Sequence, residues 1–385
     1  MRRFSHFVIF ASLLFLLSCT STPPPPLQTS LLVYRFDPPA FLEYTEDLQL
    51  TKEIPFSIPV TCGLYNTFPA PHGPFLLIEL NCPNGQTVLF LNTSSSLSAG
   101  FESDSVSQPV TDSDSHFLAW RSDGEAAYLK IDSLGSPQII QASPDGTQES
   151  VPITEFTYDL SAKPGSRDFT FTFSRGLGYG SELHLAKNDG RTTQLLYADP
   201  YNYISFARFS PDGKQIAFIK TPDSQTPFTV GELWTIPASV TFANKTPSSM
   251  QDAKFLAHVD AGHGYAANWS PDGTKIALVM RENPDDEIAD RSSEALISNI
   301  YIVDFHSGEI TQITNFMEGR VETPHWSPSG NILVFNRVLN GRMQVHIADI
   351  GGRVGSSETR DPYRASVEIK PLETEPTCCP AWMRK

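Results

Sequence analysis

Short runs in which apolar and polar residues alternate, each preceded by a tight turn, recur along this chain. The clearest run covers residues 214–219 and directly follows the turn Ser210-Pro211-Asp212-Gly213. Alternation with a period of two predicts a half-buried strand, and proline, aspartate and glycine in succession predict the turn of a hairpin. The unit is therefore a strand, a turn and a second strand. After residue 30, no stretch shows the periodicity of an amphipathic helix.

This unit repeats, and the glycines of its turns are spaced by about 40 to 60 residues. Copies at residues 269–279 and 326–335 are as clear as the first, and a copy at residues 119–131 has lost the proline. More altered copies lie around Gly73 and Gly165. Repeats of this length are typical of β-propeller blades with insertions. The residues expected to shape the turns are Asp123, Gly124, Pro211, Asp212, Gly213, Pro271, Asp272, Gly273 and Gly330.

Each clear unit continues with further strands. After Gly273, two more are expected at residues 299–304 and 310–314. The order Trp-Ser-Pro-Asp-Gly, strand, Ile-Tyr-Ile-Val-Asp, turn, Ile-Thr-Gln-Ile-Thr resembles the WD40-like (PD40) repeat of TolB-type β-propellers. The resemblance covers most of residues 60–372. It implies an all-β fold, a β-propeller of four-stranded blades.

The two ends of the chain are expected to share one blade. Residues 378–385 begin like the first strand of another unit, and residues 31–36, 41–44 and 48–50 supply the later strands that this unit lacks. A composite blade of this kind closes the ring and removes exposed sheet edges. Six internal units and the composite blade predict seven blades. The alternative is six blades, the number in the TolB family itself, if the segment around Gly73 belongs to the composite blade.

The N-terminus has the features of an export signal. Arg2 and Arg3 precede the apolar residues 7–17, and the tetrapeptide Leu-Leu-Ser-Cys ends at Cys19. This tetrapeptide resembles the bacterial lipobox, in which the cysteine receives diacylglycerol and becomes the new N-terminus after cleavage. We therefore expect residues 1–18 to be a lipoprotein signal peptide and Cys19 to be the lipidation site. The other interpretation is an ordinary signal peptide.

A tether and one domain are expected to follow the signal peptide. Residues 19–30 contain four consecutive prolines, which favour an extended polyproline II conformation, and residues 31–385 are expected to form a single β-propeller domain. Two or three acyl chains, palmitate among them, would hold the protein at the cell membrane or outer membrane, on the exported, periplasmic or extracellular side. No later stretch is apolar for long enough to cross a membrane.

The net charge of the chain limits the kinds of molecule that it is expected to bind. The chain of 385 residues has a formal net charge of −15, from 43 acidic and 28 basic residues. This balance disfavours nucleic acid and anionic lipid as electrostatic partners. We expect a monomer that is attached to the membrane through its N-terminal lipid, with an envelope protein, a peptide or a glycan as its partner.

Four cysteines remain once the lipidated one is set aside, and they allow three pairings. Cys62 and Cys82 lie at nearly equal distances along the chain from the hairpin turn expected at Gly73. We therefore predict a disulfide between them. A bond from Cys62 to the terminal pair, Cys378 and Cys379, would instead staple the ring closure. Free buried thiols are the third interpretation.

No catalytic motif is recognised in the sequence. The patterns Gly-x-Ser-x-Gly and His-Glu-x-x-His and the Walker loop are absent. Residues 176–180 are rich in glycine but lie between two predicted strands, which indicates a turn. His258 and His263 flank Asp260 without a third metal ligand at a recognisable spacing. We therefore expect no catalytic residue, no cofactor and no metal site.

Two further features permit a functional interpretation and a structural one. The acidic insertion at residues 282–290 could bind calcium or a basic partner, but it lacks the EF-hand pattern, and a solvated loop is favoured. An aromatic residue also recurs at one position of the repeat. Packing between blades explains this recurrence better than a sugar-stacking platform does. These aromatic residues are Trp120, Phe209, Trp269, Trp326 and Trp382.

Taken together, these features predict an exported, lipid-anchored β-propeller that acts as a non-catalytic binding or scaffolding module in the bacterial cell envelope. The alternatives are a propeller enzyme, such as a lyase or a glycosidase, and a ligand-capturing lipoprotein of a transport or polysaccharide system. Fold alone does not decide between these functions. A binding site is expected where the units differ, in the insertions after Thr221 and Arg281 and at the mouth of the central channel.

Overall fold

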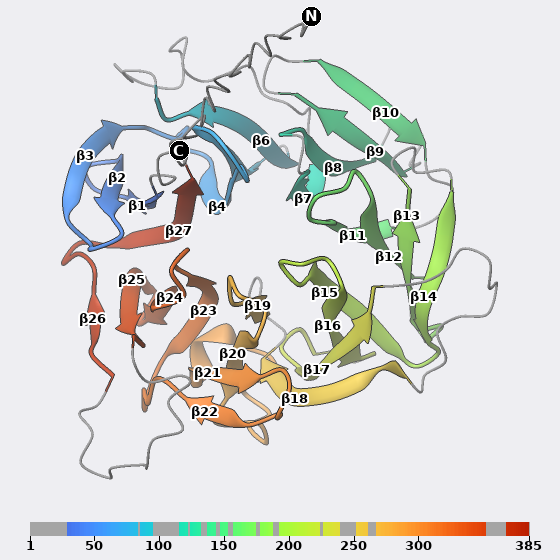
Figure 1. Ribbon diagram of the computed structural model, residues 1–385. Coiled ribbons are helices and arrows are strands. Elements are labelled where there is room, and N and C mark those ends of the chain that lie inside the picture. The colour runs from blue at the N-terminus through green and yellow to red at the C-terminus, as the bar shows by residue number, and fades with distance from the viewer. Residues whose placement is uncertain are drawn as a thin grey trace, which may run out of the picture.

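A computed structural model of the chain shows seven antiparallel sheets arranged in a ring (Figure 1). Six sheets have four strands and one has three in the part of the chain that the structure describes. The prediction of an all-β, seven-bladed propeller is confirmed, and the six-bladed alternative is wrong. The described residues are 29–83, 85–94, 115–121, 124–131, 137–143, 147–152, 157–174, 178–187, 192–223, 226–238, 252–260, 267–351 and 367–384.

We number the blades in chain order and call the composite one the closing blade. The closing blade contains β27 (Thr377–Arg384), β1 (Thr29–Arg35), β2 (Ala40–Thr45) and β3 (Leu50–Pro55). Blade 1 contains β4 (Gly63–Pro69), β5 (Phe75–Cys82) and β6 (Gly85–Asn92), and blade 2 contains β7 (Ser115–Trp120), β8 (Ala126–Ile131), β9 (Pro137–Ala142) and β10 (Gln148–Pro152). Blade 3 contains β11 (Thr157–Ala162), β12 (Phe169–Ser174), β13 (Ser181–Ala186) and β14 (Thr193–Asp199).

The remaining blades follow the same order. Blade 4 contains β15 (Asn202–Phe209), β16 (Gln215–Pro222), β17 (Val230–Pro237) and β18 (Lys254–Asp260). Blade 5 contains β19 (Ala267–Trp269), β20 (Lys275–Arg281), the 3-10 helix η2 (Ser293–Ala295), β21 (Ser298–Asp304) and β22 (Ile310–Gln312). Blade 6 contains β23 (Arg320–Trp326), β24 (Ile332–Leu339), β25 (Arg342–Asp349) and β26 (Ile369–Pro371).

Both ends of the described chain meet in the closing blade, as predicted. The strand order of this blade is β27-β1-β2-β3, and Trp382 of β27 lies opposite Leu31 of β1. Figure 1 shows the red β27 beside the blue strands of the N-terminal segment. The last strand of the sequence therefore takes the place of a first strand, and the ring closes through hydrogen bonds between the chain ends.

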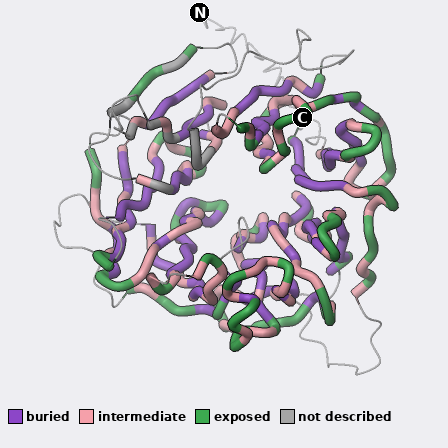
Figure 2. The backbone as a smooth tube through the Cα atoms, turned by 180° about the vertical axis from the view of Figure 1, so that it is seen from behind, coloured by how far each residue is buried: buried purple, intermediate pink, exposed green. Residues whose placement is uncertain are grey.

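Buried apolar side chains fill the boundaries between neighbouring blades. In β16, Ile216 and Phe218 face blade 3, whereas Ala217 and Ile219 face blade 5. Alternation with a period of two produces this arrangement when both faces of a strand are covered. Each of the seven boundaries has one such cluster. The outermost strands β3, β22 and β26 carry mostly exposed residues (Figure 2).

A β-bulge interrupts the first strand of most blades. The register between the first and second strands shifts in blades 1, 2, 3, 4 and 6 and in the closing blade. At the bulge, φ is 52° at Phe206, 47° at Thr323 and 59° at Cys379. Residues other than glycine rarely adopt positive φ. Three of them at equivalent places show that the bulge belongs to the repeat.

The segment that precedes the ring lies outside the described residues. It includes the predicted signal peptide, Cys19 and most of the proline tether. Within the described ranges, no helix is long and apolar enough to cross a membrane. The lipid attachment and the domain boundaries therefore stay predictions.

Candidate functional site

The two faces of the ring carry different connections. On the turn face, the first strand turns into the second in the six internal blades, and the third turns into the fourth wherever a fourth strand is described. On the loop face, the second strand connects to the third, and each blade with four described strands connects to the next. Blade 4 illustrates the loop face, because Asn202 lies opposite Pro222 and Lys220 lies opposite Glu232. It follows that one edge of this blade holds the start of the first strand, the end of the second and the start of the third.

The repeated Pro-Asp-Gly turns lie on the turn face and are held by their own side chains. Asp212 Oδ1 accepts hydrogen bonds from Ser210 Oγ at 2.7 Å and from the Lys214 N–H at 3.0 Å. These bonds lower the pKa of the Asp212 carboxyl to about 2. Gly213, with φ of 68°, donates its N–H to Ser210 O. A carboxylate held in this way shapes a turn.

The other turn residues have equivalent places. Asp272 accepts hydrogen bonds from Ser270 Oγ at 2.6 Å and from the Thr274 N–H at 3.0 Å. Pro211 and Pro271 precede the two aspartates, and Gly124, Gly273 and Gly330 have positive φ. Asp123 lies outside the described residues. All of these turns face away from the loop face, so they are separate from the insertions.

The recurring aromatic residues join one blade to the next. The indole N–H groups donate to backbone carbonyls of the preceding blade: Trp120 to Phe68 at 2.7 Å, Trp269 to Arg208 at 3.1 Å and Trp326 to Asn268 at 3.0 Å. Phe209 is buried between blades 3 and 4, and Trp382 between blade 6 and the closing blade. These contacts support the packing interpretation over a sugar-stacking platform.

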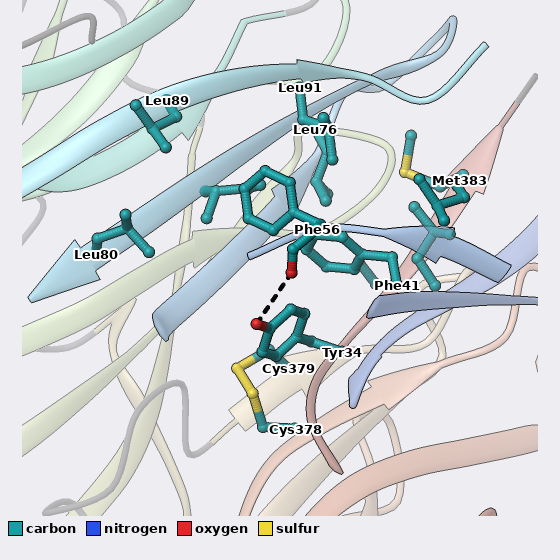
Figure 3. Packing of buried hydrophobic residues seen from close by; sticks show 14 residues of the cluster. Tyr34, Phe41, Phe56, Leu76, Leu80, Leu89, Leu91, Cys378, Cys379 and Met383 are labelled. Carbon is teal, nitrogen blue, oxygen red and sulfur yellow. Dashed lines mark hydrogen bonds between the residues drawn. A yellow bond between two sulfur atoms is a disulfide. The ribbon is translucent and has the colours of Figure 1, made fainter. Parts of the chain in front are cut away.

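All four remaining cysteines gather at one blade boundary. Cys62 is bonded to Cys82 in blade 1, and Cys378 is bonded to Cys379 in β27. Both pairs contact the apolar cluster between the closing blade and blade 1, part of which Figure 3 shows. The terminal cysteines are thus bonded to each other rather than to Cys62.

The two insertions singled out in the sequence meet on the loop face. Residues 226–229 precede β17 and residues 282–297 precede β21, and we call them together the insertion platform. Arg281, whose side chain is 1% exposed, donates to Phe228 O at 2.9 Å and to Asp290 Oδ1 at 2.8 Å. The Phe228 N–H in turn donates to Asp290 O at 3.2 Å. One buried guanidinium therefore ties an insertion of blade 4 to an insertion of blade 5.

The blade 5 part of the platform also has internal hydrogen bonds. Asp286 Oδ1 accepts the Ile288 N–H at 2.9 Å, and this bond is the main reason why the pKa of Asp286 is lowered. Asn283 Nδ2 donates to Ala295 O at 3.0 Å. The insertion is largely exposed to solvent, as expected, and hydrogen bonds of Asp286 and Asp290 also organise it. Among the described residues, no group of three or more His, Cys, Asp or Glu side chains is placed to hold a metal ion.

Exposed apolar side chains are concentrated on the loop face. On the insertion platform, one such side chain is that of Ile288, which is 69% exposed. The nearby residues Asp285 and Glu287 are exposed acids. An exposed apolar side chain on a structured insertion can anchor a binding partner. The loop face carries Phe36, Val60, Tyr65, Tyr179, Tyr201, Ile288 and Met317, and the turn face carries Leu50, Phe255 and Ile310.

A cavity of about 780 Å³ opens beside the platform. Its walls include residues 293–297 of the platform, residues 318–320 of the connection to blade 6 and residues 338–341 at the end of β24. Arg320, which lines the cavity, donates to Glu322 Oε1 at 2.7 Å. A smaller cavity of about 410 Å³ lies between the turns of blades 5 and 6 on the turn face.

The remaining sequence candidates do not converge on one site. His258 is exposed, whereas Asp260 is fully buried two residues later, and His263 lies outside the described residues. Gly178 and Gly180 have positive φ, and a Cβ at Gly180 would lie 2.0 Å from Asp199 O. Close backbone approach therefore requires the glycine, which fits the predicted turn.

Sequence reasoning missed a buried acid in the middle strand of blade 1. Glu79 lies in the apolar strand β5, is 4% exposed, and has a pKa that burial raises to about 7. Tyr65 on β4 is 59% exposed, and partial desolvation by its surroundings raises its pKa, followed by the nearby carboxylates of Glu79 and Glu322. A glutamate inside the run Leu-Leu-Ile-Glu-Leu was the available signal.

A second missed group is Lys220, which is 9% exposed at the end of β16. Its Nζ lies 2.9 Å from Asp199 and 3.9 Å from Glu232, and 4.4 Å from the centre of the Trp234 ring. Burial acts to lower the pKa of Lys220, but the bond to Asp199 and the negative charges around the lysine together outweigh it, and the pKa is raised. The lysine is therefore charged and joins blades 3 and 4.

Comparison with known proteins shows the fold. No protein-family model and no curated protein matches the chain. Two prolyl endopeptidases are represented by a structure with a TM-score of 0.56 and 10% identity, over 92% of this chain and 50% of that one. An oligogalacturonate lyase in complex with manganese has a TM-score of 0.52 and 10% identity, over 83% and 86%.

A putative TolB from Agrobacterium tumefaciens is also similar, with 16% identity over 90% of this chain and 89% of that one. Its TM-score of 0.41 is too low to support an argument. At these identities, the matches show a shared propeller fold. Because a shared fold at such low identity does not show a shared activity, the function has to be inferred from the chain's own residues.

Proposed function

We propose that this chain is a lipid-anchored, non-catalytic binding or scaffolding module of the bacterial cell envelope, which holds its partner on the loop face. The observation that carries the proposal is the insertion platform. Two insertions from different blades are fixed to each other by the buried Arg281, and they present Ile288 to solvent. A preorganised surface loses little conformational entropy on binding, which favours affinity.

The chemistry of the platform indicates the kind of partner. Ile288 offers an apolar anchor, and Asp285 and Glu287 beside it are exposed acids. An apolar socket with basic residues at its rim would complement both. We therefore favour a protein partner with such a socket.

The non-catalytic part of the proposal rests on how the ionisable groups are used. Asp212 and Asp272 hold turns, Asp286 holds the platform, and Lys220 is paired with Asp199 between blades. Groups that are committed to structural bonds are poorly placed to exchange protons with a substrate.

Membrane attachment has a direct test. Cys19→Ser removes the proposed lipid acceptor, so the chain is expected to move from the membrane fraction to the soluble fraction of exporting cells. Immunoblotting of the two fractions measures this. Continued attachment of the variant would refute the lipid anchor and leave the loop-face proposal untouched.

Partner binding is tested with the Cys19→Ser chain immobilised against envelope extract. A loop-face variant, Ile288→Ser with Met317→Ser, is compared with a turn-face variant, Leu50→Ser with Ile310→Ser. We expect mass spectrometry to identify a protein whose recovery falls at least about tenfold with the loop-face variant, a change of about 1.4 kcal/mol. Equal recovery with both variants would refute loop-face binding, and retention of a glycan in place of a protein would favour ligand capture.

A further inference from the structure

The disulfide between Cys378 and Cys379 lies in β27, the strand that closes the ring. The backbone of Cys379 also binds both neighbouring blades. Its N–H donates to Asn336 Oδ1 of blade 6 at 3.3 Å, and its carbonyl accepts a hydrogen bond from Thr67 Oγ1 of blade 1 at 2.9 Å. One residue therefore connects three blades at the point where the chain ends meet.

These bonds extend into a buried polar chain across the closure. Asn336 Nδ2 donates to Thr323 Oγ1 at 3.1 Å, and the Thr67 N–H donates to Asn66 Oδ1 at 3.0 Å. Asn336 is 5% exposed and Thr67 is 3% exposed. Loss of a partner in such a place leaves a buried polar group unsatisfied, which is costly.

The bulge at Cys379 does not depend on the disulfide. Phe206 in blade 4 and Thr323 in blade 6 adopt the same left-handed conformation at the equivalent bulge without any cysteine. The disulfide is therefore an addition to a bulge that the repeat forms by itself. Variants that lack the disulfide are expected to fold. What the disulfide adds to the bulge is a bond that can be reduced and reoxidised.

We propose that Cys378–Cys379 is a redox-modifiable site and that its oxidation state sets the strength of ring closure. A dithiol reductant would supply two electrons and two protons, so that the two cysteines become thiols and the reductant becomes a disulfide. A covalent S–S bond holds the sulfurs about 2.05 Å apart, and two thiol sulfurs in contact lie further apart.

The packing around the two cysteines should make reduction of their disulfide weaken the ring closure. Cys378 is 1% exposed and Cys379 is 7% exposed, and Figure 3 shows them beside Tyr34 in the packed cluster. Both cysteines are buried in this cluster, so we expect the separating sulfurs to displace the backbone of Cys379. That backbone carries the hydrogen bonds to Asn336 and Thr67, so both bonds weaken on reduction.

Hydrogen exchange on the full chain in detergent tests this proposal. Dithiothreitol is the probe, and differential alkylation with mass spectrometry reports which disulfide has been reduced. We expect reduction of Cys378–Cys379 to speed amide exchange in β27 and β1 by about tenfold or more, with little change in blade 4. This response should persist in Cys62→Ser/Cys82→Ser, which keeps only the terminal pair.

The matched control is Cys378→Ala/Cys379→Ala, in which dithiothreitol should leave exchange in β27 and β1 unchanged. If this variant does not fold, graded reduction of the wild type still separates the two disulfides, because alkylation measures each of them. Unchanged exchange in β27 after verified reduction of the terminal pair would overturn the proposal. A response that follows Cys62–Cys82 instead would also overturn it.

Discussion

Arg281 has an unusual place for an arginine, because its side chain is 1% exposed and its guanidinium binds three groups of the platform. Burial of a charge is costly unless the charge is paired and hydrogen-bonded. Two of its partners are backbone carbonyls, which no pattern in the sequence reveals. The sequence therefore showed that insertions exist after Thr221 and Arg281, but it could not show that one side chain joins them.

Substitution of Arg281 should loosen the platform and destabilise the protein. In Arg281→Met, Asp290 and the carbonyl of Phe228 lose their partner, and the free energy of unfolding is expected to fall by about 3 kcal/mol. Urea denaturation measures this change. Lys214→Met is the control, since Lys214 pairs with Asp212 at an exposed position, where ion pairs contribute little. Equal stabilities of the two variants would contradict the role given to Arg281.

Glu79 should make stability depend on pH. Its pKa is raised from 4.5 to about 7 in the folded chain, so between these values the folded state keeps a proton that the unfolded state has lost. The free energy of unfolding therefore falls as the pH rises through this window and loses nothing more above it. Glu79→Gln should match the wild type below pH 4.5 and be more stable by about 3 kcal/mol above pH 7.

Denaturation curves of both proteins across this range test the effect. A stability difference that does not change with pH would contradict the burial of a protonated Glu79.

At the scale of strands, local and non-local features differ in how well sequence predicts them. The Pro-Asp-Gly turns were predictable because a turn depends on a few adjacent residues, such as Asp212 and Gly213. The first-strand bulge was not, because it depends on pairing with the second strand and places Phe206 and Thr323 at positive φ. Glu79 was also missed. The hydrophobic pattern of a strand indicates which positions are buried, but it does not indicate that a charged residue can occupy one of them.

A tryptophan whose indole N–H has a hydrogen-bond partner in the neighbouring blade should stabilise the fold more than one whose indole N–H has none. In Trp269→Phe the bond to Arg208 O is lost and the ring is largely kept, so a loss of about 1 kcal/mol is expected. Trp382 occupies the same position of the repeat, and its indole nitrogen has no hydrogen-bond partner among the described residues. Trp382→Phe should therefore cost less in thermal or urea denaturation. A larger cost for Trp382→Phe would show that packing outweighs the hydrogen bond.

At the scale of the whole molecule, the ring could be predicted from the repeat and from the incomplete units at the two ends. The pairing of β27 with β1 confirms that inference. The gathering of four cysteines at the closure could not be predicted as a whole, because it depends on which blades become neighbours. The division into a turn face and a loop face follows from the same topology, and it places both insertions on one side.

The central claim, that the partner binds the loop face, is tested most directly by site-specific photo-crosslinking in cells. A photoreactive amino acid replaces Ile288 on the loop face or Ile310 on the turn face of the membrane-attached chain. These two isoleucines are 69% and 41% exposed. The account predicts a discrete crosslinked protein from position 288 and none from position 310. Crosslinks from position 310 alone, or the same product from both positions, would contradict it.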